Sequence, residues 1–135
     1  MNIENFRDIL AKDGPSEVFG IEYISTPDED ECVSRMLVTD KNTQPFGFLS
    51  GGVTLAMAET VAGVASSCLC PDRICVGMNV QANHVHSAFK GDVVTATAKI
   101  VHRGVTTHVW RVDVTNSKGQ LVTTATVTNY IVAKN

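Results

Sequence analysis

The sequence predicts a single α+β domain, in which an antiparallel sheet of about six strands is wrapped around one long central helix. The chain has 135 residues, the length of one domain, and such a domain buries roughly 68% of the surface that its unfolded chain exposes. One Ala- and Gly-rich segment is long enough for a buried helix, whereas several others alternate like strands. No repeat or linker divides the chain, so we expect residues 1–135 to form one domain.

The N-terminal third predicts one short helix and two strands. Apolar residues at helical spacing indicate a helix over residues 3–12, and Gly14-Pro15 is expected to end it. Residues 18–25 and 31–39 follow as strands. A polar, proline-containing turn separates these two strands, which favours a hairpin.

The long helix is predicted over residues 53–69, closed by Pro71. Apolar or small residues occupy nearly every face of this segment, so we expect the sheet to surround it. The segment is interrupted by Glu59 and rich in Ala, Gly, Ser and Thr. This composition favours a core helix over a membrane span.

The remainder of the chain predicts four strands rich in Val, Thr and Ile. Short turns separate the last three strands from their predecessors, and antiparallel neighbours use such connections. We therefore expect the four strands to form a meander. The predicted strands are residues 74–85, 92–102, 107–115 and 120–133, and the turns are residues 90–92, 103–104 and 116–119.

The composition excludes several classes of partner and cofactor. The net charge is −3, and the 11 basic residues are scattered, so no nucleic-acid surface is expected. The N-terminus lacks the pattern of a signal peptide, and we expect a cytoplasmic protein that does not bind membranes. Cys32, Cys68, Cys70 and Cys75 lack the spacing of a zinc site. Buried, reduced thiols are the expectation for these cysteines, although their clustering leaves a metal or redox role open.

Glu59 is the only acidic residue of the predicted central helix. Burying a carboxylate costs free energy and tends to raise its pKa, so buried acids occur where a partner or a function offsets that cost. Two interpretations are open at this point. Glu59 is either a catalytic carboxylate or a residue that reaches the surface or pairs with an arginine.

Ser50-Gly51-Gly52 marks the transition from loop to helix. Unpaired N–H groups at a helix N-terminus can stabilise an oxyanion, and glycine lets another group approach closely. A simple tight turn into the helix is the alternative. Gly51 and Glu59 are eight residues apart, or about 12 Å along a helix, which is too far to serve one carbonyl within one chain. If both are catalytic, the site must be built across a dimer.

Further polar residues flank this helix start. Gln44 could place an amide beside the same loop, and His84 and His86 share one face at the end of a strand. Surface or pocket-lining histidines are favoured over a metal-binding pair, because no other ligands accompany them, and no metal is expected. His102, His108 and Trp110, on later predicted strands, give no specific signal.

Three segments resemble the hotdog-fold acyl-CoA thioesterases of the phenylacetate-degradation and menaquinone-pathway type. They are Gln44-Pro45-Phe46-Gly47-Phe48-Leu49-Ser50-Gly51-Gly52, Ala58-Glu59-Thr60 and Asn83-His84-Val85, and the resemblance covers about residues 15–132. It implies an acyl-CoA substrate, no cofactor, and a dimer or dimer of dimers with sites between subunits. It also implies Glu59 as nucleophile or general base, the Gly51 N–H of the partner chain as oxyanion donor, Gln44 near the thioester, and His84 lining the pocket.

The sequence departs from this family's pattern at two positions. Ser50 stands where relatives usually have histidine, and it can donate one hydrogen bond but lacks an imidazole's shape and charge. Gly63 stands where relatives often have Ser or Thr, a hydroxyl that Thr60 could replace. Relatives often place a basic residue near the nucleotide phosphates in the stretch that here contains Thr106, and Arg103 is the nearest candidate. The remaining substrate-binding candidates are Gly52 and His86.

Three functions follow as hypotheses. The first is hydrolysis of an acyl-CoA, with an aromatic acyl group as one candidate. The second is a hotdog protein that binds acyl-CoA without turning it over, motivated by Ser50, Gly63 and the few basic residues. The third, least favoured, is a dehydratase or hydratase that uses His84 with Glu59.

Overall fold

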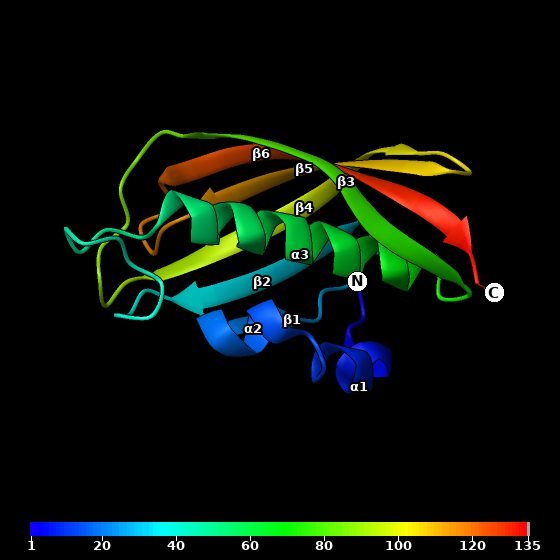
Figure 1. Cartoon of the computed structure of the whole chain (residues 1–135), viewed down its shortest axis with the longest axis horizontal. Helices are drawn as coiled ribbons and strands as arrows, with labels where there is room; N and C mark the ends of the chain where they lie inside the picture. The colour runs from blue at the N-terminus through cyan, green and yellow to red at the C-terminus, as the bar shows by residue number, and fades with distance from the viewer. Residues whose placement is uncertain (135) are drawn as a thin grey trace.

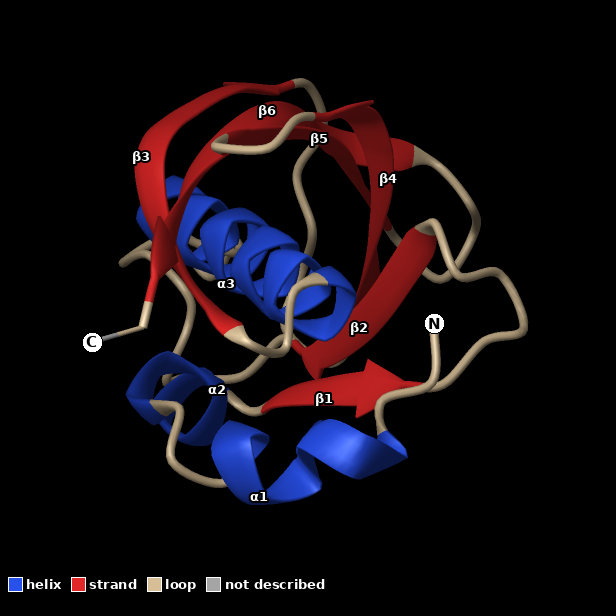
Figure 2. Cartoon of the chain, turned by 90° about the vertical axis from the view of Figure 1, so that its right-hand side faces the viewer, coloured by secondary structure: helices blue, strands red, loops and turns tan. Residues whose placement is uncertain are grey.

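The computed structural model describes residues 1–134, so only Asn135 of the predicted domain lies outside the described chain. It has a six-stranded antiparallel sheet that curves around the long helix α3 (Gly51–Leu69), which confirms the predicted fold class. Figure 2, a view close to the axis of α3, shows the strands curving around this helix. The strands are β1 (Ile21–Ile24), β2 (Glu31–Leu37), β3 (Arg73–His84), β4 (Val93–Arg103), β5 (Thr107–Thr115) and β6 (Leu121–Ala133).

The strand order in the sheet is β1-β2-β4-β5-β6-β3 (Figure 1). The predicted hairpin of β1 and β2 is confirmed, and so are the turns that join β4 to β5 and β5 to β6. The predicted meander of four strands is wrong for β3, because this strand pairs with β6 instead of β4. A glycine turn at residues 90–92 shows where the chain reverses, but it does not determine which strand the next segment joins.

The N-terminal segment differs most from expectation. The predicted helix over residues 3–12 is a 3₁₀ turn (Glu4–Phe6) followed by the short helix α1 (Arg7–Leu10). Gly14-Pro15 begins a second helix, α2 (Gly14–Phe19), instead of ending the first. The reason is local: the Asp13 side chain accepts a hydrogen bond from the Ser16 N–H, and proline is well tolerated in a first helical turn. The following strand therefore starts only at Ile21.

The core lies between α3 and the concave face of the sheet. One face of α3 is fully buried, including Met57, Val61 and Ala65 at successive turns. The facing strands contribute small residues such as Ala96 and Ala98, which let the helix approach closely. Each fully buried valine or methionine contributes about 1.5–3 kcal/mol. In length and apolar character α3 also meets the criteria of a membrane-spanning helix, a property that it shares with core helices of soluble proteins.

The opposite face of α3 is not covered within one chain. The sheet was expected to surround the helix, yet Glu59 is exposed and Thr60, Gly63 and Val64 are only half-buried. The sheet stops at β3, an edge strand whose Ile74, Val76 and Met78 side chains are 43%, 46% and 62% exposed. The expectation that Glu59 is buried therefore fails for the single chain.

A buried polar cluster links α3 to the sheet. Ser66 Oγ accepts hydrogen bonds from Trp110 Nε1 at 2.8 Å and from Asn129 Nδ2 at 2.9 Å, and it lies 2.9 Å from His108 Nδ1. Because two donors fill its lone pairs, the Ser66 hydroxyl must donate its own proton to His108. His108 is therefore neutral, with its proton on Nε2, which faces Cys70 Sγ at 3.9 Å. This cluster fixes the position of α3 along the sheet.

Candidate active site

The start of α3 is capped by Ser50. The Ser50 side chain accepts a hydrogen bond from the Val53 N–H at 3.4 Å, and its carbonyl accepts from the Thr54 N–H and the Thr54 hydroxyl. Gly51 and Gly52 are the first two residues of the helix, so their N–H groups have no intrahelical acceptor. The hydroxyl of Ser50 therefore serves the helix itself, a role that sequence reasoning did not assign to it.

The loop before α3 is held by a buried asparagine. Asn42 donates to the carbonyls of Leu37 and Phe19, and its own side-chain oxygen accepts from the Thr39 N–H at 2.8 Å. This anchoring presents Gln44 beside the helix start. The side-chain oxygen of Gln44 accepts from the Phe46 N–H, which directs the carboxamide into a local turn.

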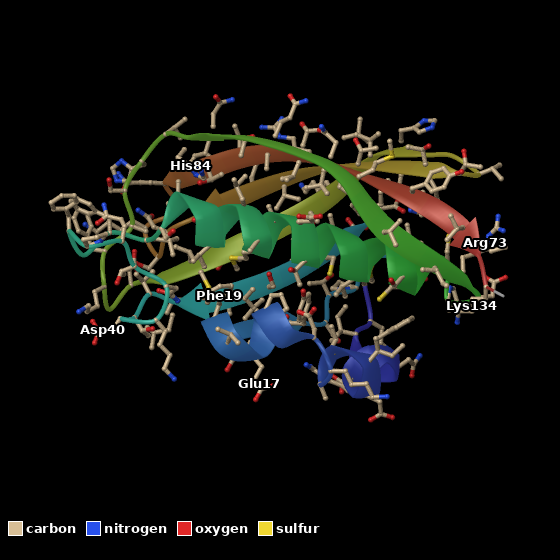
Figure 3. The ribbon with its side chains drawn as sticks, viewed as in Figure 1. Glu17, Phe19, Asp40, Arg73, His84 and Lys134 are labelled. Atoms are coloured by element: carbon tan, nitrogen blue, oxygen red, sulfur yellow. The ribbon has the colours of Figure 1, made fainter. Side chains whose placement is uncertain are left out.

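His84, at the end of β3, lies against the start of α3. Its Nδ1 is 2.9 Å from the Thr123 hydroxyl on β6, and its Nε2 is 3.0 Å from the place where a Cβ atom of Gly51 would lie. The absence of a side chain at Gly51 thus gives the imidazole its room. Figure 3 shows His84 at the end of the molecule where α3 begins, whereas Arg73, at the start of the same strand, lies at the opposite end.

These residues enclose a pocket of about 380 Å³ at the helix N-terminus. It brings together four of the candidates predicted from sequence, namely Gln44, Gly51, His84 and His86. Thr54 and Thr123 also line this pocket and were not predicted. The same helix and strand contain other threonines, and only the fold shows which of them line the pocket.

Glu59 is not among the residues that line this pocket. It lies two turns further along α3, and its carboxylate rests against Gly77 of β3. Thr60 and Gly63 line a different, more apolar groove of about 390 Å³, which also contains Phe6, Ile9 and Val64. Within one chain, the predicted catalytic residues therefore occupy two separate surfaces.

Arg103 and Thr106 lie at the opposite end of α3 from the Gly51 pocket. The Arg103 guanidinium donates to the carbonyl of Leu69, the last residue of α3, at 3.5 Å. This end of the helix is about 27 Å from Gly51 at 1.5 Å per residue. Thr106 is exposed in the turn between β4 and β5. Neither residue joins the Gly51 pocket of its own chain.

Burial sets the protonation of several side chains. Desolvation lowers the pKa of His108, and the electrostatic influence of Arg103 and of His102 lowers it further. Burial raises the pKa of Cys32 to about 12 and that of Cys68 to about 11, and it also raises the pKa of Cys75. These three thiols therefore stay protonated near neutral pH, which disfavours nucleophilic chemistry at them.

Comparison with known proteins places these features in a family. A sequence profile of the Thioesterase superfamily matches residues 46–123. A 1,4-dihydroxy-2-naphthoyl-CoA hydrolase from Listeria monocytogenes is 39% identical over 110 residues, which cover 81% of this chain and 88% of the relative.

Solved structures give the same result. A thioesterase from Staphylococcus aureus, crystallised as a glutamine-to-alanine variant, is 41% identical with a TM-score of 0.81, over 87% of this chain and 97% of that one. A crystal structure of a glutamate-to-alanine variant of the same S. aureus protein is also known. A thioesterase from Haemophilus influenzae is 31% identical with a TM-score of 0.89, covering 98% of this chain and 92% of the other.

Proposed function

The chain belongs to the thioesterase superfamily and is an acyl-CoA thioesterase, and on this premise we propose that Glu59 of one protomer and the α3 N-terminus of a second protomer act on one thioester carbonyl. The observation that carries the proposal is the separation of the two groups. Gly51 opens into the pocket that holds Gln44 and His84, while Glu59 faces a different surface beside β3.

The exposed edge of the sheet supports assembly from two copies. β3 is an edge strand of 12 residues with unpaired backbone groups on one side and exposed Ile74, Val76 and Met78 side chains. Such an edge readily accepts another strand. Pairing of β3 with β3 of a second copy would cover these apolar residues and bring Glu59, which lies beside β3, toward the partner's pocket. A dimer, or a dimer of dimers, is therefore proposed as the working form.

The S. aureus relative supports the choice of residues. Its two substituted positions, a glutamine and a glutamate, are 15 residues apart in that protein. Gln44 and Glu59 have the same separation here. Substitution of both residue types at this spacing in a thioesterase of 41% identity favours Gln44 and Glu59 as the active-site pair of this chain.

The proposed chemistry uses side chains, backbone and water. The thioester carbonyl accepts hydrogen bonds from the free N–H of Gly51, at the positive end of the α3 dipole, and the amide of Gln44 lies near the thioester. Glu59 either takes a proton from an attacking water or attacks the carbonyl carbon itself, forming an anhydride that water then cleaves. Negative charge collects on the carbonyl oxygen at Gly51. Breaking of the C–S bond releases the CoA thiolate, which takes up a proton, and the carboxylic acid.

An aromatic acyl group is the proposed substrate class. The L. monocytogenes relative is by name a hydrolase of a naphthoyl-CoA. The groove that contains Thr60, the neighbour of Glu59 on α3, is lined mainly by apolar groups, including Phe6 and Ile9. Its volume of about 390 Å³ suits a bulky, uncharged acyl group. His84 and His86 at the other pocket, and Arg103 at the far end of α3, remain candidates for contacts with the CoA part.

Glu59→Gln is the most direct test of the catalytic residue. The amide has nearly the same shape but neither accepts a proton nor attacks a carbonyl, so kcat for benzoyl-CoA or naphthoyl-CoA should fall by about 10²–10⁴-fold. Thiol release is the measurement, with Glu17→Gln as a control at an exposed residue of α2. A Glu59→Gln enzyme with the rate of the wild type would disprove the role of this residue.

A further inference from the structure

Gly77 of β3 lies directly opposite the Glu59 side chain. A Cβ atom placed on Gly77 would lie 3.1 Å from Cδ and 3.3 Å from Cγ of Glu59, and closest of all to the carboxylate oxygen Oε1. The carboxylate therefore occupies the space that any side chain at position 77 would fill. None of the salt bridges among residues 1–134 involves Glu59, and the backbone of Gly77 is the part of β3 that its carboxylate approaches.

The φ angle gives no reason for glycine at this position. Gly77 is not among the glycines with positive φ, which are Gly20, Gly47, Gly91 and Gly119. Glycine within a strand weakens the strand, because it loses more conformational freedom on folding and contributes no packing. The space taken by Glu59 accounts for the absence of a side chain.

A β-bulge directs Gly77 toward the helix. The pairing of β3 with β6 shifts between Gly77 and Asn79, so that one extra residue enters β3. Before the bulge Cys75 faces inward, and after it Val80 and Ala82 do. Residues seven positions apart in a regular strand point to opposite faces. The extra residue puts Gly77 and His84 on the same face, so one strand contacts both Glu59 and the α3 N-terminus.

We propose that Gly77 is a positioning residue, which leaves open, at the β3 bulge, the space that the Glu59 carboxylate occupies during catalysis. This inference rests on the proposed role of Glu59. Its consequence is specific: a single methyl group at position 77 displaces the carboxylate without removing it. Since the end of an exposed glutamate can move aside at little cost, the displacement should affect the reaction far more than the stability of the fold.

The test is Gly77→Ala in the full chain with an aromatic acyl-CoA. We expect kcat to fall by about 10–100-fold, because a misplacement of about 1 Å costs this much, while KM stays within about twofold and the urea midpoint changes little. Gly14→Ala is the matched control, since a Cβ at Gly14 meets no atom within 4 Å. Unchanged kcat in Gly77→Ala would overturn the inference.

Replacing Glu59 by the shorter aspartate distinguishes a collision with the alanine at position 77 from a general disturbance of the fold. Glu59→Asp should lower kcat in the wild-type background and cost much less, or even restore activity, when Gly77 is alanine. Equal costs of Glu59→Asp in the two backgrounds would overturn the inference. If Gly77→Ala lowers the urea midpoint, the substitution is repeated in a Glu59→Ala chain. When the alanine destabilises the fold only because it collides with the Glu59 side chain, the midpoint should no longer fall in that chain.

The two proposals fail in distinguishable ways. Full activity of Glu59→Gln removes the proposed function itself. An inactive Glu59→Gln enzyme together with a fully active Gly77→Ala enzyme removes only the role of Gly77.

Discussion

Two glycines let α3 and β3 approach each other closely. Gly51 on the helix makes room for His84 of the strand, and Gly77 on the strand makes room for Glu59 of the helix. Each contact places one large polar side chain against bare backbone. A side chain at position 51 would collide with His84, and a side chain at position 77 would collide with Glu59.

Ser50 allows the helix cap and the oxyanion site to be tested apart. Ser50→Ala removes the cap and should lower the free energy of unfolding by about 1 kcal/mol. Ser50→Asp caps equally well but places a negative charge beside the proposed oxyanion, so it should keep the stability and lose at least about tenfold in kcat. Urea unfolding and thiol release measure the two effects. A fully active Ser50→Asp enzyme would speak against an oxyanion site at Gly51.

At this scale the sequence identifies a residue when its type is unusual for its surroundings. Glu59 stood out as the only acid of an apolar helix, and Gly51 as part of a Gly-Gly pair before a helix. Thr123 is an ordinary residue for a strand, and the reason for a glycine at position 77 does not show in the sequence. Their importance comes from the bulge and the strand pairing, which bring them opposite Glu59 and His84 and which no local pattern encodes.

At the scale of elements, the Ser66 cluster makes the position of α3 sensitive to pH. The hydrogen bond from Ser66 requires that Nδ1 of His108 carries no proton, and burial lowers the pKa of His108 in the folded protein. The unfolded chain takes up this proton near pH 6.5 and the folded one only at lower pH, so the unfolded state binds more protons below pH 6.5.

Stability should therefore be fully retained above pH 6.5 and decline as the pH falls below it, by at most about 1.4 kcal/mol per pH unit for this single group. His108→Asn keeps an acceptor near the position of Nδ1 but does not titrate, so it should flatten this decline. Urea midpoints at pH 7.5 and 5.5, at one protein concentration, provide the measurement. A decline of the same slope in His108→Asn would show that other groups cause it.

The elements themselves were predictable to different degrees. The long helix follows from its length and its apolar and small residues, and the last three strands follow from their alternation; all four were predicted to within two residues of their observed bounds. The place of β3 at the sheet edge was not predicted, because it depends on which strand accepts it after the crossover at residues 85–92. The N-terminal helices were misread because a Gly-Pro pair can end one helix or, after the cap of Asp13, begin another.

At the scale of the whole molecule, the proposed catalytic groups of one chain do not form a single site. The lining of the pocket at the α3 N-terminus includes no carboxylate, and the carboxylate of Glu59 lies further along α3, against Gly77 of β3. The edge strand β3 exposes apolar side chains that a partner would cover. The proposed dimer accounts for both features at once, since it supplies each pocket with the partner's Glu59.

Mixing two inactive variants tests this account most directly. Glu59→Gln and Gln44→Ala protomers are unfolded together, refolded at equal amounts and assayed for thiol release. If each site takes Gln44 from one protomer and Glu59 from the other, a mixed dimer has one intact site and one doubly substituted site. About half of the dimers are mixed, so about a quarter of the wild-type activity should return. If the mixture stays as inactive as the separate variants, each site lies within one chain and the account is wrong.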